Sequence, residues 1–263
     1  MRAALALLFA AVNVGGQPPP KPPVADPPKG ALVLVGGGKM PADVRAAFLD
    51  KAGGAAKAKV VVIPTASAAA DDADEHPAYL KPWRDAKAGE VTLLHTRDPK
   101  TANSDDFVKP LRDATGIWFS GGDQSKLTKA YAGTKVLEAI KERYRDGAAV
   151  GGTSAGAAVV SGVMITGGTD EATTADGFGL LGGAVVDQHF SQRKREKRLA
   201  GVIAKHPKLL GIGLDEGTAV VIAGDAAEVL GEGEAHFLTA EPKAEPVRLK
   251  AGGQYDLKGR TAK

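Results

Sequence analysis

Residues 148–158 read Ala-Ala-Val-Gly-Gly-Thr-Ser-Ala-Gly-Ala-Ala, and this stretch decides the fold class. The apolar run Ala148–Gly151 predicts a buried strand, and the small residues after Ser154 can open a helix. A serine flanked by glycines at a strand-to-helix turn is the pattern of a nucleophile elbow, which lifts the hydroxyl above the sheet edge. The backbone N–H of Ala155 at the helix start would then face a developing oxyanion. A glycine-rich turn with an incidental serine is the alternative, because five residues alone are a weak signal.

Short apolar runs alternate with amphipathic segments before this turn. The predicted strands are Ala31–Val35, Val60–Ile63, Val91–His95 and Ile117–Phe119, and the predicted helices are Pro41–Ala52, Ala78–Ala88, Asp105–Asp113, Ser125–Tyr131 and Lys135–Asp146. Buried strands that alternate with helices predict a parallel sheet covered on both faces. The expected fold is therefore α/β, a three-layer sandwich around a mostly parallel sheet. Ligands of such folds bind at the carboxyl ends of the strands.

The pattern changes after Gly211, where short strands follow one another without helices. We expect strands at Leu214–Ile222, Glu228–Leu230, Ala235–Leu238 and Pro246–Leu249. These strands are interpreted as extensions of the sheet or an edge hairpin, a C-terminal β extension, because their length is too small for a separate domain. Residues 31–263 are accordingly predicted to form a single domain.

The first thirty residues carry a different signal. Met1-Arg2 is followed by an apolar run, Ala3–Val14, and then by two glycines, which is the pattern of a signal peptide over residues 1–16. The run is too short to span a bilayer. Residues 17–30, QPPPKPPVADPPKG, are typical of an extended proline-rich linker. These two segments predict an exported protein, whether periplasmic, held at the cell envelope or secreted.

Composition excludes several kinds of chemistry. The 263 residues (26.9 kDa) contain no cysteine, which rules out disulfides, a thiol nucleophile, iron–sulfur clusters and cysteine-ligated zinc. No HExxH motif occurs, and serine chemistry needs no ion, so neither a metal nor another cofactor is predicted. A net charge of +3 and 5% aromatic residues argue against nucleic-acid binding.

A serine nucleophile needs a base, and His189 is the best placed of the five histidines. It follows the apolar run Ala184–Val186, so it should lie at the same sheet edge as Ser154. The others have simpler interpretations as surface, structural or helix-end residues: His76, His95, His206 and His236.

The base needs an acid that holds its tautomer. Glu216 is the first choice, because Asp215-Glu216 follows the apolar stretch Leu210–Leu214 and so also lies at a strand end. Asp187 and Asp170 are rivals that spacing does not exclude.

Cations crowd the segment after His189. Ser191–Leu199 reads SQRKREKRL and predicts a helix that begins at Ser191, with Arg195 and Arg198 on one face. Arg193 lies in the first turn, where the helix dipole disfavours a cation. These arginines either bind an anionic ligand, since guanidinium matches carboxylates bidentately, or form a solvated basic face, which composition alone favours.

Taken together, four segments resemble the serine peptidase family of cyanophycinases and aspartyl dipeptidases, and the match is better to the cyanophycinases. They are FSGGDQ (119–124), GGTSAGA (151–157), DQHFSQRKREKRL (187–199) and GIGLDEGTA (211–219). The resemblance implies a flavodoxin-like fold related to class I glutamine amidotransferases, with Ser154 as nucleophile, His189 as base and Glu216 as orienting acid. It further implies that the substrate is held by six residues: Gln124, Asp187, Gln188, Arg193, Arg195 and Arg198. Amidotransferase chemistry itself is disfavoured, because it uses a cysteine.

Three functions are compatible with these residues and with the resemblance. The first is a serine exopeptidase that releases β-Asp-Arg dipeptides from cyanophycin, a polyaspartate with arginine on each β-carboxyl. Its oxyanion hole would combine the N–H of Ala155 with one from Gly121 or Gly122. The second is a dipeptidase that acts on short peptides with N-terminal aspartate, and the third is an exported, non-catalytic module that binds an anionic polymer. The partner is thus a peptide or polyaspartate rather than nucleic acid, and family members are often homodimers.

Overall fold

The computed structural model describes residues 27–241 and 244–263, and its largest element is a nine-stranded mixed sheet. The strand order is β15-β14-β11-β10-β1-β5-β4-β2-β3. Five of these strands run parallel: β1 (Ala31–Val35), β5 (Ala149–Thr153), β4 (Gly116–Phe119), β2 (Lys59–Ile63) and β3 (Glu90–Leu93). The predicted signal peptide, and the predicted linker up to residue 26, lie outside the described residues.

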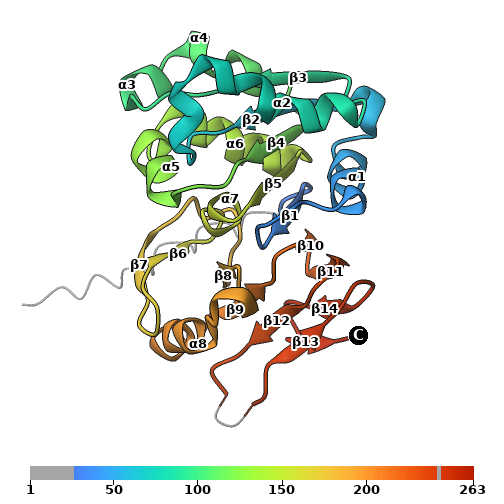
Figure 1. The fold of residues 1–263 in the computed structure, drawn as a ribbon, viewed down its shortest axis with the longest axis vertical. Helices are drawn as coiled ribbons and strands as arrows, with labels where there is room; N and C mark the ends of the chain where they lie inside the picture. The colour runs from blue at the N-terminus through green and yellow to red at the C-terminus, as the bar shows by residue number, and fades with distance from the viewer. Residues whose placement is uncertain (1–26, 242–243) are drawn as a thin grey trace, which may run out of the picture.

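Both faces of the parallel strands are buried, as their near-continuous apolar sequences predict. In β1, Leu32 and Leu34 pack into one apolar cluster and Val33 and Val35 into another. The helices on the two faces appear in Figure 1 around the upper half of the molecule. They are α1 (Ala42–Lys51) and α2 (His76–Asp85), then the short α3 (Pro99–Ala102) and α4 (Asp105–Val108), and α5 (Gln124–Tyr131), α6 (Lys135–Asp146) and α7 (Ala155–Ala158). The α/β sandwich expected from the sequence is therefore present.

Four antiparallel strands extend this sheet beyond β1. They are β10 (Thr218–Ala223), β11 (Ala226–Gly231), β14 (Gln254–Asp256) and β15 (Thr261–Ala262). The predicted strand Leu214–Ile222 is wrong as one element. It is interrupted at Asp215–Gly217, where Gly217 adopts φ +67° and the chain passes from one sheet to the other.

A second sheet, which the sequence did not predict, occupies the lower half of Figure 1 with helix α8 (Glu196–Lys205). Its order is β13 (Val247–Leu249), β12 (Ala235–Leu238), β9 (Leu210–Leu214) and β8 (Ala184–Gln188). Strands β12 and β13 therefore do not extend the main sheet, because β12 pairs with β9. A separate hairpin, β6 (Val163–Gly167) with β7 (Thr173–Asp176), lies between the two halves.

Two further predicted helices are shorter in the structure than expected. The segment Asp105–Asp113 forms α4 and then a 3₁₀ turn at Lys109–Leu111, since Pro110 has no amide hydrogen to continue an α-helix. The segment Ser191–Leu199 is broken by Lys194, which adopts a left-handed φ of +51° between a 3₁₀ turn and α8. Within the described residues, none of the helices has the length and apolar character required to cross a membrane.

Candidate active site

Ser154 lies in a strained turn between β5 and α7. Its φ of +53° and ψ of −112° are costly for a residue with a side chain and are typical of functional sites. The turn is fixed from both sides, because Ser154 N–H donates to the Val35 carbonyl at 2.9 Å and the Ser154 carbonyl accepts N–H bonds of 3.0 Å from Ala157 and Ala158. A Cβ on Gly156 would lie 2.3 Å from the Phe119 carbonyl oxygen, so only glycine fits. The structure therefore has, at Ser154, the strand-to-helix turn that the sequence predicts.

Three side chains form one hydrogen-bonded chain at this turn. Ser154 Oγ lies 2.9 Å from His189 Nε2, and His189 Nδ1 lies 2.5 Å from Glu216 Oε1. Since the carboxylate accepts the Nδ1 proton, Nε2 is the unprotonated nitrogen that accepts from the hydroxyl. This arrangement can transfer the Ser154 proton to the imidazole and stabilise the resulting imidazolium.

The expectation that all three residues lie at the edge of one sheet needs correction. Ser154 follows β5 of the nine-stranded sheet, His189 follows β8 of the four-stranded sheet, and Glu216 lies in the segment that links them. The two sheets meet here through backbone bonds, with His189 N–H donating to Gly36 at 2.7 Å and Gly217 N–H donating to Gly37 at 2.9 Å.

Gly37 and Gly38 pack directly against this chain, and sequence reasoning gave them no role. Gly37 has φ +112°, and a Cβ there would lie 2.3 Å from His189 Cε1. A Cβ on Gly38 would lie 3.0 Å from the Cβ of Glu216. The signal for this role was the glycine run at the end of the first strand, since consecutive glycines mark close backbone approach.

Burial lowers the pKa of His189 below its usual 6.5, and the positive charge of Arg193 acts in the same direction. The hydrogen bond that His189 Nδ1 donates to the Glu216 carboxylate opposes this shift and raises the pKa. Because the pKa is lowered, the imidazole is neutral at pH 7 and available as a base.

We therefore expect kcat/KM to fall as the pH drops through a midpoint below 6.5. Arg193→Ala removes a nearby cation, so it should move this midpoint to higher pH. Lys197→Ala is the control, because this exposed cation is paired with Asp170. pH–rate profiles of the three proteins measure the shift, and an unmoved midpoint in Arg193→Ala would contradict the assignment of this limb to His189.

The predicted oxyanion-hole residues surround the serine. A Cβ on Gly121 would lie 3.5 Å from the Cβ of Ser154, and Gly122 follows with φ +138°. Ala155 is the first residue of α7, and its side chain is buried. The structure thus places Gly121 beside Ser154, and Ala155 follows Ser154 directly at the start of α7.

A cleft of about 420 Å³ opens beside Ser154. It is lined by three arginines and mostly polar neighbours: Gly122, Asp123, Gln124, Ser154, Thr166, Gly167, Gln188, Arg193, Arg195 and Arg198. Five of the six residues predicted to hold a substrate line this cleft, and the sixth, Asp187, is buried directly behind it.

Several of these six residues are bonded to the protein itself. Arg198 donates through Nε to Asp187 Oδ2 at 2.9 Å and through Nη2 to Oδ1, and its Nη1 donates to the Gly168 carbonyl at 2.7 Å. Gln124 Nε2 donates to the Ile165 carbonyl at 2.6 Å. Arg198 and Gln124 therefore hold the β6–β7 hairpin beside the cleft.

Arg195 and Gln188 form a second pair at the cleft wall. Arg195 Nη1 donates to Gln188 Oε1 at 2.8 Å and to the Gln188 carbonyl at 2.5 Å. Burial lowers the pKa of Arg195 below its ordinary value. Arg193 shows no side-chain hydrogen bond to another described residue, so its guanidinium is the one most open to a ligand.

The two rival acids do not contact His189. Asp187 is buried and bonded to Arg198, while Asp170 is exposed and lies 3.8 Å from the Lys197 ammonium. Glu216 alone among the three candidates bonds to the imidazole.

Arg198→Ala should lower the free energy of unfolding by up to about 3–5 kcal/mol, because it leaves the buried Asp187 carboxylate with only the 3.4 Å contact to Arg195 Nη1. Lys197→Ala, which removes an exposed neighbouring cation, should change it by less than about 1 kcal/mol. Urea unfolding of the three proteins measures both values. A loss below about 1 kcal/mol in Arg198→Ala would show that water compensates the carboxylate.

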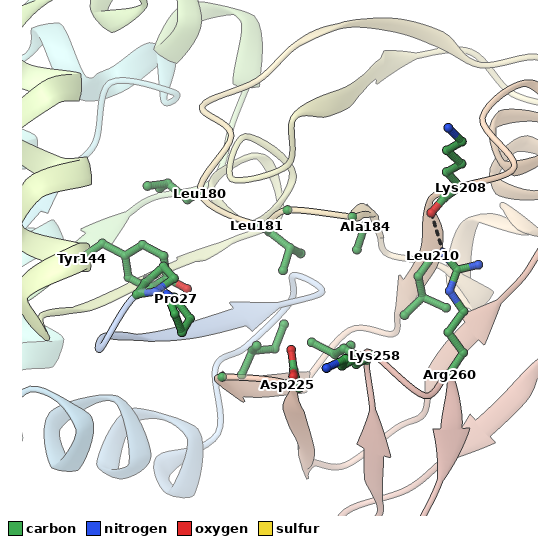
Figure 2. Close-up of a pocket in the computed structure, with 16 residues that line it drawn as sticks. Pro27, Tyr144, Leu180, Leu181, Ala184, Lys208, Leu210, Asp225, Lys258 and Arg260 are labelled. Carbon is green, nitrogen blue, oxygen red and sulfur yellow. Dashed lines mark hydrogen bonds between the residues drawn. The ribbon is translucent and has the colours of Figure 1, made fainter. Parts of the chain in front are cut away.

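Another cleft, of about 410 Å³, lies at the amino ends of β8 and β9, away from Ser154. Figure 2 shows Tyr144, Leu180 and Leu210 lining it, with Arg260 donating to the Lys208 carbonyl. Its lining contains no serine, threonine or histidine. No cluster of three or more metal-ligating side chains occurs within residues 27–241 and 244–263.

The α/β sandwich and the serine–imidazole–carboxylate chain at its strand ends define the protein as a hydrolase of the serine class. Residues 32–230 match the family model described as Peptidase family S51, and the chain belongs to this family. It is therefore a serine peptidase, which argues against the non-catalytic binding module.

Relatives support this assignment. The chain is 36% identical over 217 residues to a cyanophycinase from Nostoc sp. and to one from Trichormus variabilis, covering 78% of this chain and 72% of each relative. A solved peptidase from an acI-B1 actinobacterium superposes with a TM-score of 0.71 at 26% identity, covering 88% of this chain and 98% of that one.

Proposed function

We propose that this peptidase is an exopeptidase of the cyanophycinase type. The observation that carries the proposal is the hydrogen-bonded chain from Ser154 through His189 to Glu216. Ser154, at one end of this chain, lines a cleft together with Arg193, Arg195 and Arg198. Guanidinium groups match carboxylates in geometry and charge, so this cleft suits a substrate that carries carboxylates; in cyanophycin these are the α-carboxylates of the arginines, because the aspartate β-carboxyls are amidated. Similarity to cyanophycinases supports the same substrate.

In the proposed reaction, Ser154 Oγ attacks a main-chain aspartyl carbonyl while His189 Nε2 takes the hydroxyl proton. Backbone N–H groups of Ala155 and of Gly121 or Gly122 stabilise the oxyanion. His189 then gives the proton to the leaving amine, and water hydrolyses the acyl-enzyme by the reverse proton transfers. Glu216 holds the imidazole and stabilises its charged form. The product is a β-Asp-Arg dipeptide.

The test is incubation of the purified protein with cyanophycin, followed by mass spectrometry for the dipeptide. Release of β-Asp-Arg supports the proposal. Absence of the dipeptide, together with hydrolysis of Asp-Ala or other Asp-X peptides, would assign the protein to the second candidate, the aspartyl dipeptidase.

One feature of the cleft favours that second candidate. Cyanophycin carries an arginine on every repeat, and the buried carboxylate at the cleft, Asp187, is already paired with two arginines of the protein. Among the residues that line the cleft, Asp123 is the one acidic side chain against three arginines, so the cleft suits a substrate with more carboxylates than cations. Hydrolysis that is indifferent to charge reversal at Arg193 and Arg195 would favour the dipeptidase, whereas a loss of cyanophycin hydrolysis would favour the first candidate.

We also propose that residues 1–16 direct export and that residues 17–30 act as a spacer before the peptidase domain. Expression of the full chain with mass determination of the mature product tests the first point. Retention of Met1–Gly16 in the exported fraction would overturn it. Homodimerisation is likewise a proposal, and analytical ultracentrifugation measures it.

A further inference from the structure

A second hydrogen-bonded network lies behind the Gly121–Gly122 turn, at the carboxyl ends of β2 and β3. Thr65 Oγ1 lies 2.8 Å from His95 Nδ1, and His95 Nε2 lies 2.9 Å from Asp71 Oδ1. The order hydroxyl, imidazole, carboxylate repeats that of the active site. Thr65 is 0% exposed, however, so no substrate can reach its hydroxyl, and the network does not form a second catalytic centre.

One direction of proton donation satisfies every member of this network. Hydrogen bonds from Arg97 and His95 lower the pKa of Asp71 to about 2, so Asp71 is a carboxylate that accepts the Nε2 proton of His95. Burial lowers the pKa of His95, which leaves its Nδ1 free to accept from Thr65. Thr65 Oγ1 in turn accepts from the Tyr131 hydroxyl at 2.7 Å. The Thr65–Tyr131 end of this network is buried, while Asp71 at the other end is exposed to solvent.

Arg97 connects this network to the backbone. Its Nε donates to Asp71 at 3.0 and 3.2 Å, and its Nη2 donates to the same carboxylate at 3.0 Å. The other contacts go to two backbone carbonyls: Nη1 donates to Thr65, and Nη2 donates to Ser67 at 2.7 Å. The guanidinium therefore bonds the peptide unit that precedes Ala66 and the one that follows Ser67.

Ala66 is the support for the turn that faces Ser154. Its carbonyl accepts the Asp123 N–H at 2.9 Å, and a Cβ on Gly122 would lie 2.2 Å from the same oxygen. Because Gly122 packs so closely on this carbonyl, any shift of Ala66 is transmitted to Gly121 and Gly122. Gly121 is the residue that lies beside Ser154.

We propose that Arg97, oriented by Asp71, is a positioning residue that sets the distance between the N–H groups of Gly121–Gly122 and the oxyanion formed at Ser154. The proposal rests on the proposed role of Ser154 and of this turn. Arg97 does not line the cleft, so it acts through the backbone and not on the substrate. Oxyanion donors stabilise the transition state more than the bound substrate. Displacing them by a change at Arg97 should therefore lower kcat and leave KM nearly unchanged.

The test compares Arg97→Ala and Arg97→Lys with wild type. We expect Arg97→Ala to lower kcat on the order of 10²-fold, the effect of removing one oxyanion donor, with KM within about twofold. Its rate of inactivation by diisopropyl fluorophosphate, which forms a tetrahedral adduct on the serine, should fall by a similar factor. Arg97→Lys keeps the charge beside Asp71 but cannot span both carbonyls. Its kcat and its inactivation rate should therefore lie between those of wild type and Arg97→Ala.

Arg143→Ala is the matched control. Arg143 also donates to a backbone carbonyl, that of Ala114 at 3.1 Å, and to an aspartate, Asp146 at 3.4 Å, but it does so before the start of β4, at the far end of that strand. Its kcat and its inactivation rate should equal those of wild type. Circular dichroism shows whether each variant is folded. If Arg97→Ala does not fold, the comparison is made between Arg97→Lys and wild type.

The outcomes separate this inference from the proposed function. If the Arg97 variants keep wild-type kcat and inactivation rate while Ser154→Ala is inert, the inference fails alone. A raised KM at unchanged kcat would overturn it in favour of a substrate contact. If Ser154→Ala is active, or diisopropyl fluorophosphate labels another residue, the proposed function fails first.

Discussion

Ser154→Ala is expected to lower kcat on the order of 10⁶-fold, because no other described hydroxyl lies within hydrogen-bond distance of His189 Nε2. The residual rate would come from binding and from the oxyanion donors alone. Hydrolysis of the substrate identified in the cyanophycin and Asp-X assays measures the loss, and binding of the same substrate by calorimetry should persist.

Ser104→Ala serves as the control for this variant, since Ser104 is an exposed serine that precedes α4. It should retain full activity. If Ser154→Ala hydrolyses the substrate within about tenfold of the wild-type rate, the result contradicts Ser154 as the nucleophile.

Glu216→Ala should lower kcat on the order of 10⁴-fold, the scale measured when the acid of a comparable triad is removed. The carboxylate 2.5 Å from His189 Nδ1 fixes the tautomer, and without it the imidazole loses both its orientation and the stabilisation of its charged form. Steady-state kinetics at pH 8, above the pKa of the imidazole, separates this effect from a change in ionisation.

Asp170→Ala tests the rival assignment directly. Asp170 lies on the hairpin and contacts Lys197, so its removal should leave kcat unchanged. Equal losses in the Glu216 and Asp170 variants would indicate that the hairpin moves onto His189 during turnover.

The sequence predicted the elements that carry local signals. The turn at Ser154 was recognisable because no side chain fits at Gly152 or Gly156 on either side of it, and this requirement leaves a pattern in the sequence. His189 and Glu216 were recognisable because each follows an apolar strand. Their hydrogen bonds with one another and with Ser154 depend on how the two sheets pack, which the sequence does not show.

The remaining features depend on pairings between distant segments. Strand β12 resembles β10 in apolar content, and nothing local indicates that β12 pairs with β9 in another sheet. The pairing of Arg198 with Asp187 is of the same kind, since a basic helix face and a buried ion pair have similar sequences. The break at Lys194 was missed because lysine does not favour a left-handed φ, and the tertiary contacts of the neighbouring arginines outweigh that preference.

The two sheets meet at the reactive serine, so the rate of turnover depends on how they pack against each other. The hydroxyl belongs to one sheet and the imidazole to the other, so a separation of about 1 Å between them would slow proton transfer strongly even if each sheet kept its own hydrogen bonds. Mild denaturant or heat should therefore abolish peptide hydrolysis before circular dichroism records any loss of strands. Inactivation ahead of unfolding would then measure the strength of the contact between the halves.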